Sequence, residues 1–477
     1  MTLTSILVFT VAALLYALLL PSQWRKWALY GGSIVAIYWL QPVIIIRRLD
    51  FLFPTLTLGL VVLAWLASRA PDQHWTKQDS IAIVVLVSVV LLLSFGRYIQ
   101  PDYRLTASNP PMPATIGLWL AGAGLLTVAL YFVPVSQKKL SATGIILILL
   151  VFIILKTEPL AETVSRHLRA WEGRPTRFAS ASELSWLGFS YVAFRLIHTL
   201  RDRQTGRLPV LSLRDYVTYV IFFPAFTAGP IDRAERFLTD LQALPTMAGW
   251  DANRIVQGSM RIAVGIGKKF VIADALAYIA LNATKAHQLD STGSMWILLY
   301  AYTFQIYFDF SGYSDIAIGI GQLLGIKLPE NFSQPYLKRN ITLFWQSWHM
   351  TLSQWVRFYV FSPLTRALLK RKPRPSPTKL AFVGQMTTML VIGLWHGVSW
   401  GFVVWGLWHG AGLFIHKIYS DKTRPYYIQL RNRPRMNQLI GVLGVIVTFH
   451  FVALGWVWFA IPDIATSWDV FLKLVGM

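Results

Sequence analysis

The sequence predicts an all-α protein whose helices cross a membrane many times. Of its 477 residues, 55% are hydrophobic and only 14% are charged, whereas a soluble domain carries roughly one-quarter charged residues. Apolar runs of helical length recur along the whole chain, while strand-like alternation is nowhere sustained. This pattern excludes an ordinary soluble globule and makes a transmembrane barrel a poor alternative.

Charge and cysteine content narrow the classes of function. The formal net charge is +22, and the Lys and Arg residues lie in short loops between apolar runs. The positive-inside rule explains this distribution better than a nucleic-acid partner does. The chain has no Cys, which excludes disulfides, thiolate metal sites and a thioester on the protein itself, so catalysis must use oxygen or nitrogen groups.

The N-terminal part, residues 1–157, is expected to be a scaffold of transmembrane helices. One helical span needs roughly 20 mostly apolar residues to cross a hydrocarbon core of about 30 Å. Six runs of simple aliphatic composition meet this need: 3–20, 27–46, 51–68, 81–96, 115–134 and 142–156. No basic segment precedes the first run, so we expect a retained span and not a cleaved signal.

The later apolar runs differ because they contain Trp, His, Asp and Arg. They are 186–200, 215–228, 262–281, 293–310, 315–326, 341–361, 380–395, 401–416 and 439–460. Polar side chains at membrane depth are costly and point to function. We therefore expect the chain after Glu158 to carry the function.

One predicted hairpin carries the strongest candidate residue, His396. Basic clusters at 366–379 and 417–435 flank the hairpin, so both of its ends should face the cytoplasm. Each apolar arm has about 16 residues, or about 24 Å of helix, which is shorter than the hydrocarbon core. The turn should then lie within the membrane, with His396 at the bottom of a pocket open to the cytoplasm. An imidazole in such a pocket is suited to act as a general base. The alternative role for His396 is structural, with its ring hydrogen-bonded to a neighbouring carbonyl.

A second candidate, His349, lies in a tryptophan-rich segment. Helical spacing would place Trp345, Leu352 and Val356 on the same helix face as His349. From the residues alone, a packing role is the stronger reading for a single histidine on an apolar face.

The third histidine, His409, repeats the Leu-Trp-His-Gly pattern that surrounds His396. Three glycines lie near it, at Gly406, Gly410 and Gly412, and small residues allow membrane helices to pack closely. We therefore expect a structural or substrate-lining role for His409.

Asp309 and Asp315 flank Gly312 and form the one candidate carboxylate pair in this part of the chain. Acid–base chemistry is one role for them, but we favour capping or bridging of a helix that breaks at Gly312. A nucleophile elbow, a zinc-protease motif and a phosphate-binding loop are all absent from the sequence, which removes support for those enzyme classes.

Four sequence blocks resemble the membrane-bound O-acyltransferase family. They are Phe222-Phe-Pro-Ala-Phe-Thr-Ala-Gly-Pro-Ile-Asp-Arg233, Pro329-Glu-Asn-Phe332, Trp348-His-Met-Thr-Leu-Ser353 and Leu394-Trp-His-Gly397. The likeness runs from about residue 180 to residue 460 and is greatest to the bacterial branch that holds alginate O-acetylation and D-alanyl transfer proteins. It implies a catalytic core at 180–460, followed by a C-terminal tail at 461–477. One departure is Phe358, which stands where the family often has an Asp.

The resemblance implies a helical membrane fold with roughly 11–14 membrane helices, some of them short and re-entrant. It also implies that His396 is catalytic and that His349 lies nearby in a membrane-crossing tunnel. His409, Trp348, Trp395, Asn331 and Asp309 are expected to line the substrate path. No metal and no permanently bound cofactor is expected.

The implied reaction moves an acetyl or D-alanyl group from a cytoplasmic thioester, either acetyl-CoA or an acyl carrier protein's phosphopantetheine, to an acceptor hydroxyl. The acceptor would be an extracytoplasmic polysaccharide, a teichoic acid or a relay protein. We expect a multi-pass protein of the cytoplasmic (inner) membrane, with lipid and these proteins as partners and no nucleic acid. A transporter or channel that uses His396, Asp309 and Asp315 is the main alternative, and a non-catalytic scaffold is a third.

Overall fold

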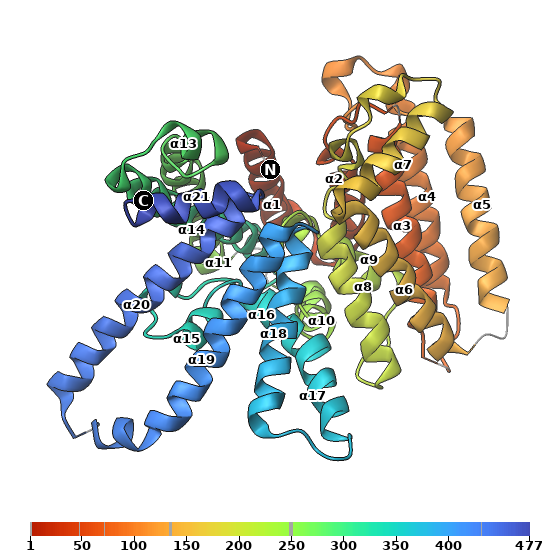
Figure 1. Cartoon of the computed structure of the whole chain (residues 1–477). Helices are drawn as coiled ribbons and strands as arrows, with labels where there is room; N and C mark the ends of the chain where they lie inside the picture. Colours follow the sequence, from red (N-terminus) through yellow and green to blue (C-terminus); the bar gives the residue numbers. More distant parts are fainter. Residues whose placement is uncertain (1, 47, 71, 133–135, 248–250, 431) are drawn as a thin grey trace. The chain divides into compact units, whose positions relative to one another are not determined.

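The computed structural model describes residues 2–46, 48–70, 72–132, 136–247, 251–430 and 432–477. Helices and turns make up this part of the chain (Figure 1), so the predicted all-α class is confirmed. The chain divides into two compact units. Unit 1 comprises Met1–Ala263 and Ile316–Pro329, and unit 2 comprises Val264–Asp315 and Glu330–Met477.

Unit 1 contains the aliphatic helices and several shorter amphipathic ones. Its helices are α1 (Leu3–Leu19), α2 (Arg25–Trp39), α3 (Leu49–Ala67), α4 (Lys77–Phe95), α5 (Pro113–Phe132), α6 (Gln137–Lys156), α7 (Glu158–Trp171), α8 (Phe189–Gln204), α9 (Leu213–Ile221), α10 (Ala234–Ala243) and most of α11 (Ala252–Ile266). All six predicted aliphatic runs correspond to helices, with ends that differ by up to seven residues, the largest difference being at the end of α2. Few side chains of α5 and α6 are buried, as expected for helices whose apolar surface faces lipid.

Unit 2 carries the histidines. Its helices are α12 (Asp274–Ala277), α13 (Ala283–Gln288), most of α14 (Thr292–Leu323), α15 (Ile341–Trp345), α16 (Met350–Val356), α17 (Ser362–Leu369), α18 (Pro377–His396), α19 (Trp400–Leu430), α20 (Pro434–Ala460) and α21 (Ile464–Leu474). Two π-helical segments, Gly267–Ala273 and Arg357–Phe361, interrupt the α-helical pattern. Segments of this kind often occur at functional sites.

Five helices among the described residues are long and apolar enough to cross a membrane. They are Leu49–Ala67, Lys77–Tyr98, Pro113–Phe132, Gln137–Lys156 and Pro434–Ala460, and the apolar α1 is slightly shorter. The polytopic membrane class is therefore confirmed, while the finer count of 11–14 membrane helices stays a prediction. The residue bounds that we assigned to scaffold, core and tail also stay predictions.

Two predicted elements were wrong in detail. We expected a break at Gly312, but α14 continues through it from Thr292 to Leu323. We expected one helix at 341–361, but the segment divides into α15, α16 and a π-helical turn. A Cβ atom on Gly312 would lie 2.8 Å from the carbonyl oxygen of Gly265 in α11 and 2.9 Å from the amide nitrogen of Lys269 in the π-helix, so this glycine allows close packing where these two segments meet and does not end α14.

Candidate active site

His396 is the last residue of α18, and α19 begins four residues later at Trp400. The two helices lie side by side (Figure 1) because glycines remove side chains from their interface. A Cβ atom on Gly406 would lie 2.7 Å from the carbonyl oxygen of Met389, and one on Gly393 would clash with the carbonyl oxygen of Phe402. The expectation that glycines near His409 mark close helix packing is therefore confirmed.

The predicted lengths of the hairpin arms were wrong. α18 has 20 residues and α19 has 31, which correspond to about 30 Å and about 46 Å at about 1.5 Å per residue. Our inference placed His396 within the membrane because both arms were too short to cross it, and that reason no longer holds. The polar residues beyond His416 continue the helix, because Lys, Arg and Tyr are compatible with a helix that leaves the membrane.

Aromatic rings surround the imidazole of His396. Its ring centroid lies 4.5 Å from that of Trp395, 4.8 Å from Phe459 and 5.6 Å from Trp405. These side chains come from α18, α19 and α20, so three helices contribute to the position of one ring.

We expected His349 to lie within a continuous helix, but it lies in the turn between α15 and α16. Its backbone is left-handed, with φ 41° and ψ 53°, a conformation that His adopts more readily than most residues. The side chain is 3% exposed, and its Nε2 atom has no hydrogen-bond partner among the described residues. The same turn directs Trp348 into the interior, where it is 5% exposed.

The structure brings His349 and His396 together on the wall of one cavity. The cavity has a volume of about 40 Å³ and is lined by Ile306, Phe310, Trp345, Trp348, His349, Leu352, Ile392, His396, Trp405, Trp456 and Phe459. We call it the histidine chamber. No carboxylate and no lysine is among these residues, so its two imidazoles are the groups able to exchange a proton near neutral pH.

Trp395 does not line the chamber but contacts both histidines. Its ring centroid lies 5.8 Å from that of His349, in addition to its contact with His396. Sequence reasoning missed Phe310, Trp456 and Phe459, which complete the chamber wall. They belong to α14 and α20, far away in the sequence, and a lone aromatic residue in an apolar helix carries no signal of its own.

Asn331 braces the turn that holds His349. It is fully buried, its Nδ2 donates to Ser314 Oγ at 3.0 Å, and its Oδ1 accepts from Thr351 Oγ1 at 2.6 Å. Its backbone carbonyl also accepts from the amide of Met350 at 2.9 Å. Asn331 does not line the chamber, so the structure makes it a positioning residue and not a substrate-lining one.

His409 lies outside the chamber, behind its wall. It is fully buried, and its ring packs against Trp405 at 5.0 Å, Trp345 at 5.2 Å and Phe451 at 5.8 Å. Neither ring nitrogen has a hydrogen-bond partner among the described residues. These contacts support the structural alternative for His409 over a substrate-lining role.

Asp309 and Asp315 pair with lysines of the Gly267–Ala273 π-helix. Lys268 Nζ lies 2.7 Å from Asp315 Oδ2, and Lys269 Nζ contacts Asp309. The predicted bridge across a broken helix was wrong, because each carboxylate bridges α14 to the π-helix. Asp309 does not line the chamber, so its predicted place on the substrate path is not supported by this cavity.

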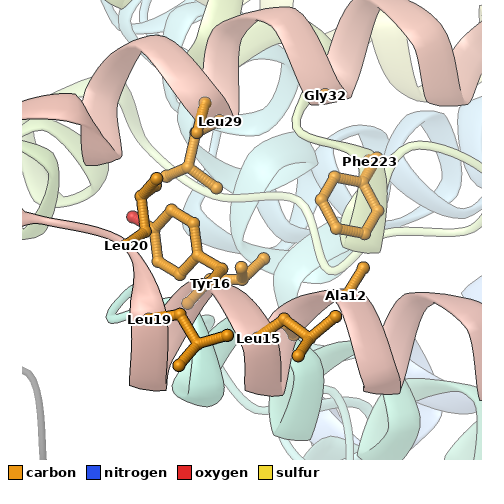
Figure 2. A pocket seen from close by; sticks show the side chains of 11 residues that line it. Ala12, Leu15, Tyr16, Leu19, Leu20, Leu29, Gly32 and Phe223 are labelled. Atoms are coloured by element: carbon orange, nitrogen blue, oxygen red, sulfur yellow. The ribbon is translucent and has the colours of Figure 1, made fainter.

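A second cavity, in unit 1, is larger but chemically plain. It has a volume of about 380 Å³ and lies between α1 and α2, with Ala12, Leu15, Leu19, Leu29 and Phe223 on its wall (Figure 2). Tyr16 is its only titratable lining residue. Nothing on this wall suits acyl transfer, which needs a base near neutral pH.

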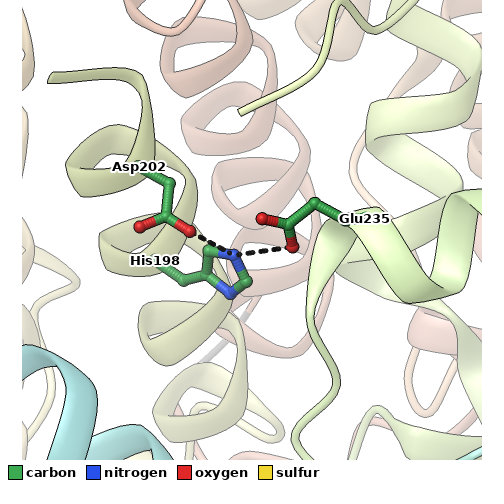
Figure 3. A group of neighbouring side chains, drawn as sticks. All are labelled: His198, Asp202 and Glu235. Atoms are coloured by element: carbon green, nitrogen blue, oxygen red, sulfur yellow. Dashed lines mark ion pairs between the residues drawn. The ribbon is translucent and has the colours of Figure 1, made fainter. Parts of the chain in front are cut away.

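Unit 1 also holds one cluster with metal-ligand chemistry, formed by His198, Asp202 and Glu235 (Figure 3). Their ligand atoms lie within 4.8 Å of one another. Arg233 Nη2 lies 3.2 Å from Asp202 and 3.0 Å from Glu235. Both carboxylates thus pair with a cation of the chain itself, so the cluster is an ion-pair network among side chains.

The architecture matches that of a known family. Residues 67–456 match the profile described as MBOAT, membrane-bound O-acyltransferase family. The chain belongs to this family. The match covers most of the chain, including α18, both chamber histidines and much of unit 1.

Individual relatives agree with this assignment. The chain is 32% identical over 295 residues to a teichoic acid D-alanyltransferase of Streptococcus thermophilus, covering 60% of this chain and 71% of the relative. It is 32% identical over 313 residues to a peptidoglycan O-acetyltransferase of Helicobacter pylori, covering 63% and 56%. It is 34% identical over 286 residues to a probable alginate O-acetylase of Pseudomonas aeruginosa, covering 60% and 50%. The match thus spans only about half of the last two relatives.

Membership confirms the predicted class of enzyme, a membrane-bound O-acyltransferase, and the transporter alternative is not favoured. The relatives are named for three different acceptors and two different acyl groups. The names of the relatives therefore do not specify one acyl group or one acceptor for this chain.

Proposed function

We propose that the chain transfers an acetyl or D-alanyl group from a cytoplasmic thioester to a hydroxyl group outside the cytoplasm. One observation carries the proposal: His349 and His396 line the same mostly aromatic chamber, and no other titratable side chain lines it. Polysaccharide, teichoic acid or a relay protein would provide the hydroxyl. Relatives named for acting on teichoic acid, peptidoglycan and alginate support this class of acceptor.

In the proposed reaction, His396 is the general base. Its neutral imidazole takes the proton of the acceptor hydroxyl while the oxygen attacks the thioester carbonyl. A C–O bond forms, the C–S bond breaks, and the proton then passes from His396 to the departing thiolate. Direct transfer needs no nucleophile from the protein, in agreement with the absence of Cys.

Two indole groups are suited to stabilise the oxyanion formed during the attack. Trp345 and Trp405 line the chamber, and the Nε1 atom of each is buried with no hydrogen-bond partner among the described residues. A donor held in a dry site needs no reorganisation when charge develops. The amide of Asn331 is not available for this role, because it is already bonded to Ser314 and Thr351.

The donor would approach from the cytoplasmic side. Basic residues are concentrated at 366–379 and 417–435, next to the ends of α18, α19 and α20, and would attract the phosphates of coenzyme A or an acidic carrier protein. The same charges place these helix ends in the cytoplasm by the positive-inside rule. This topology corresponds to a multi-pass protein of the cytoplasmic membrane.

The test compares His396→Ala and His396→Gln with the intact protein at equal membrane abundance. Mass spectrometry of esters released from envelope polymers should show loss of one ester, because general-base catalysis contributes about 10²–10⁴-fold to the rate. His167→Ala serves as the matched control, since His167 is an exposed residue of α7. Unchanged ester content in both His396 variants would exclude His396 as the base.

A further inference from the structure

The largest cavity described in unit 2 lies between α19 and α20 and is distinct from the histidine chamber. Its volume is about 790 Å³, against about 40 Å³ for the chamber. α15 lies between the two long helices (Figure 1), and residues 339–343 form one side of the cavity. We call this cavity the hairpin pocket.

The lining of the hairpin pocket changes from polar to apolar along its length. Tyr419, Tyr427 and Asn437 line it at the end where α19 stops and α20 starts. Leu443, Val447 and Phe451, further along α20, line the opposite end together with Thr448, and His416 of α19 also belongs to the lining. A ligand that fits this lining has a polar head and an apolar tail.

A cation lies on the wall of the pocket. Arg339 is exposed, and its guanidinium has no ion pair or hydrogen bond among the residues that the structure describes. Its side chain lies against α20 at Gly441, where an added Cβ atom would lie 3.3 Å from Arg339 Nε, and its backbone lies against Gly444, where an added Cβ atom would lie 2.5 Å from Arg339 O. The wall therefore offers a positive charge that the neighbouring helix does not neutralise.

The apolar end of the pocket faces the hydrocarbon core of the membrane. α20 is one of the helices able to cross a membrane, and Leu443 and Val447 are 52% and 68% exposed. Ile415, on the facing side of α19, is 65% exposed. In a membrane-bound family, exposed apolar side chains of this kind contact lipid, so a ligand can enter the pocket laterally from the bilayer.

We propose that the hairpin pocket binds an anionic phospholipid of the cytoplasmic leaflet. Arg339 holds the phosphate, the hydroxyls of Tyr419 and Tyr427 and the amide of Asn437 contact the head group, and one acyl chain lies along Val447 towards Phe451. At about 30 Å³ per water-sized group, the volume of about 790 Å³ accommodates roughly 26 non-hydrogen atoms, enough for a head group and part of one chain. The basic loop residues give this end of the hairpin the cytoplasmic orientation.

The inference depends on the pocket and on membership in a membrane-bound family, and not on the proposed acyl transfer. The experiment therefore measures lipid binding and not catalysis. Phosphatidylglycerol and phosphatidylcholine, each with a photoreactive diazirine in one acyl chain, are added separately to the purified full-length protein in nanodiscs. After illumination, labelled peptides are identified by mass spectrometry.

Phosphatidylglycerol should label the α20 peptide around Val447 about tenfold more than phosphatidylcholine does. Arg339→Gln should remove this preference, whereas Lys379→Gln, at an exposed basic residue at the start of α18, should leave it unchanged. Val447→Trp puts a large side chain at an exposed position of the wall and should reduce labelling by both lipids.

Equal labelling by the two lipids in the intact protein would overturn the proposal. So would a preference for phosphatidylglycerol that persists in Arg339→Gln, or labelling by both lipids that is undiminished in Val447→Trp. Displacement of the lipid by coenzyme A would also overturn it, because the pocket would then hold the phosphates of a soluble thioester donor. The ester content of the His396 variants, by contrast, tests the proposed acyl transfer and does not affect the conclusion on lipid binding.

Discussion

Asn331 offers the sharpest test of how the turn carrying His349 is held in place. Replacing Asn331 with Ala removes two side-chain hydrogen bonds, to Ser314 at 3.0 Å and from Thr351 at 2.6 Å. The carbonyl that accepts from Met350 is kept, because it belongs to the backbone. The substitution therefore loosens the link from the turn to α14 and α16 without deleting any residue of the chamber.

The expected cost follows from these two bonds. A buried hydrogen bond contributes about 0.5–1.5 kcal/mol to the free energy of unfolding, and within membrane proteins the average is about 0.6 kcal/mol. Two bonds together give about 1–3 kcal/mol. The coupling between Asn331 and Thr351 alone should be about 0.5–1.5 kcal/mol when it is measured by a double-mutant cycle.

The assay is denaturant unfolding in mixed micelles, followed by tryptophan fluorescence, for Asn331→Ala, Thr351→Val, the double variant and the intact protein. Thr351→Ser is the control, since it retains the hydroxyl that donates to Asn331. Acyl transfer by Asn331→Ala should also fall, because the position of His349 is less well defined. Additive losses, with a coupling near zero, would refute the view that Asn331 braces this turn through Thr351.

Two further predictions concern packing and charge. Gly406→Ala should destabilise the protein by about 1–3 kcal/mol and lower acyl transfer, because the added Cβ would lie 2.7 Å from the carbonyl oxygen of Met389. Gly117→Ala is the control, since a Cβ there meets no atom within 4 Å, and equal stability of the two variants would contradict this prediction. The Arg169 guanidinium, through its hydrogen bonds, holds the pKa of the Glu183 carboxyl below its usual value. The pair therefore stabilises the fold fully above about pH 4.3, the usual pKa of a Glu carboxyl. This stabilisation is lost as the pH falls through the lowered pKa. Glu183→Gln should lower the unfolding temperature at pH 7 and weaken its dependence on acid pH, and identical melting curves for variant and intact protein would count against this contribution.

The aliphatic half of the chain was predictable because composition alone decides it. A run such as 142–156 has no stable alternative to a helix in a membrane, and α6 forms there. The residues at which helices end were less predictable. α19 extends 14 residues beyond His416 because polar residues that leave the membrane can continue a helix, and hydropathy carries no information about that continuation.

The candidate site divides in a similar way. Proximity of His349 and His396 followed from the family resemblance, and the structure places both on one cavity. The break that makes His349 a turn residue did not follow from the sequence, because Trp-Gln-Ser-Trp-His has neither Pro nor Gly to indicate it. The break depends on tertiary bonds from Asn331 to Met350 and Thr351, which no local pattern contains.

The left-handed backbone at His349 determines which variants can be interpreted. An L-residue pays roughly 1–2 kcal/mol to adopt this region, and Asn and Asp tolerate it better than others do. Replacement by Ala would remove the imidazole and also strain the turn, so lost activity would have two causes. Replacement by Asn keeps a residue suited to φ 41° and removes only the ring. For this histidine, asparagine and not alanine isolates the contribution of the imidazole to the chemistry.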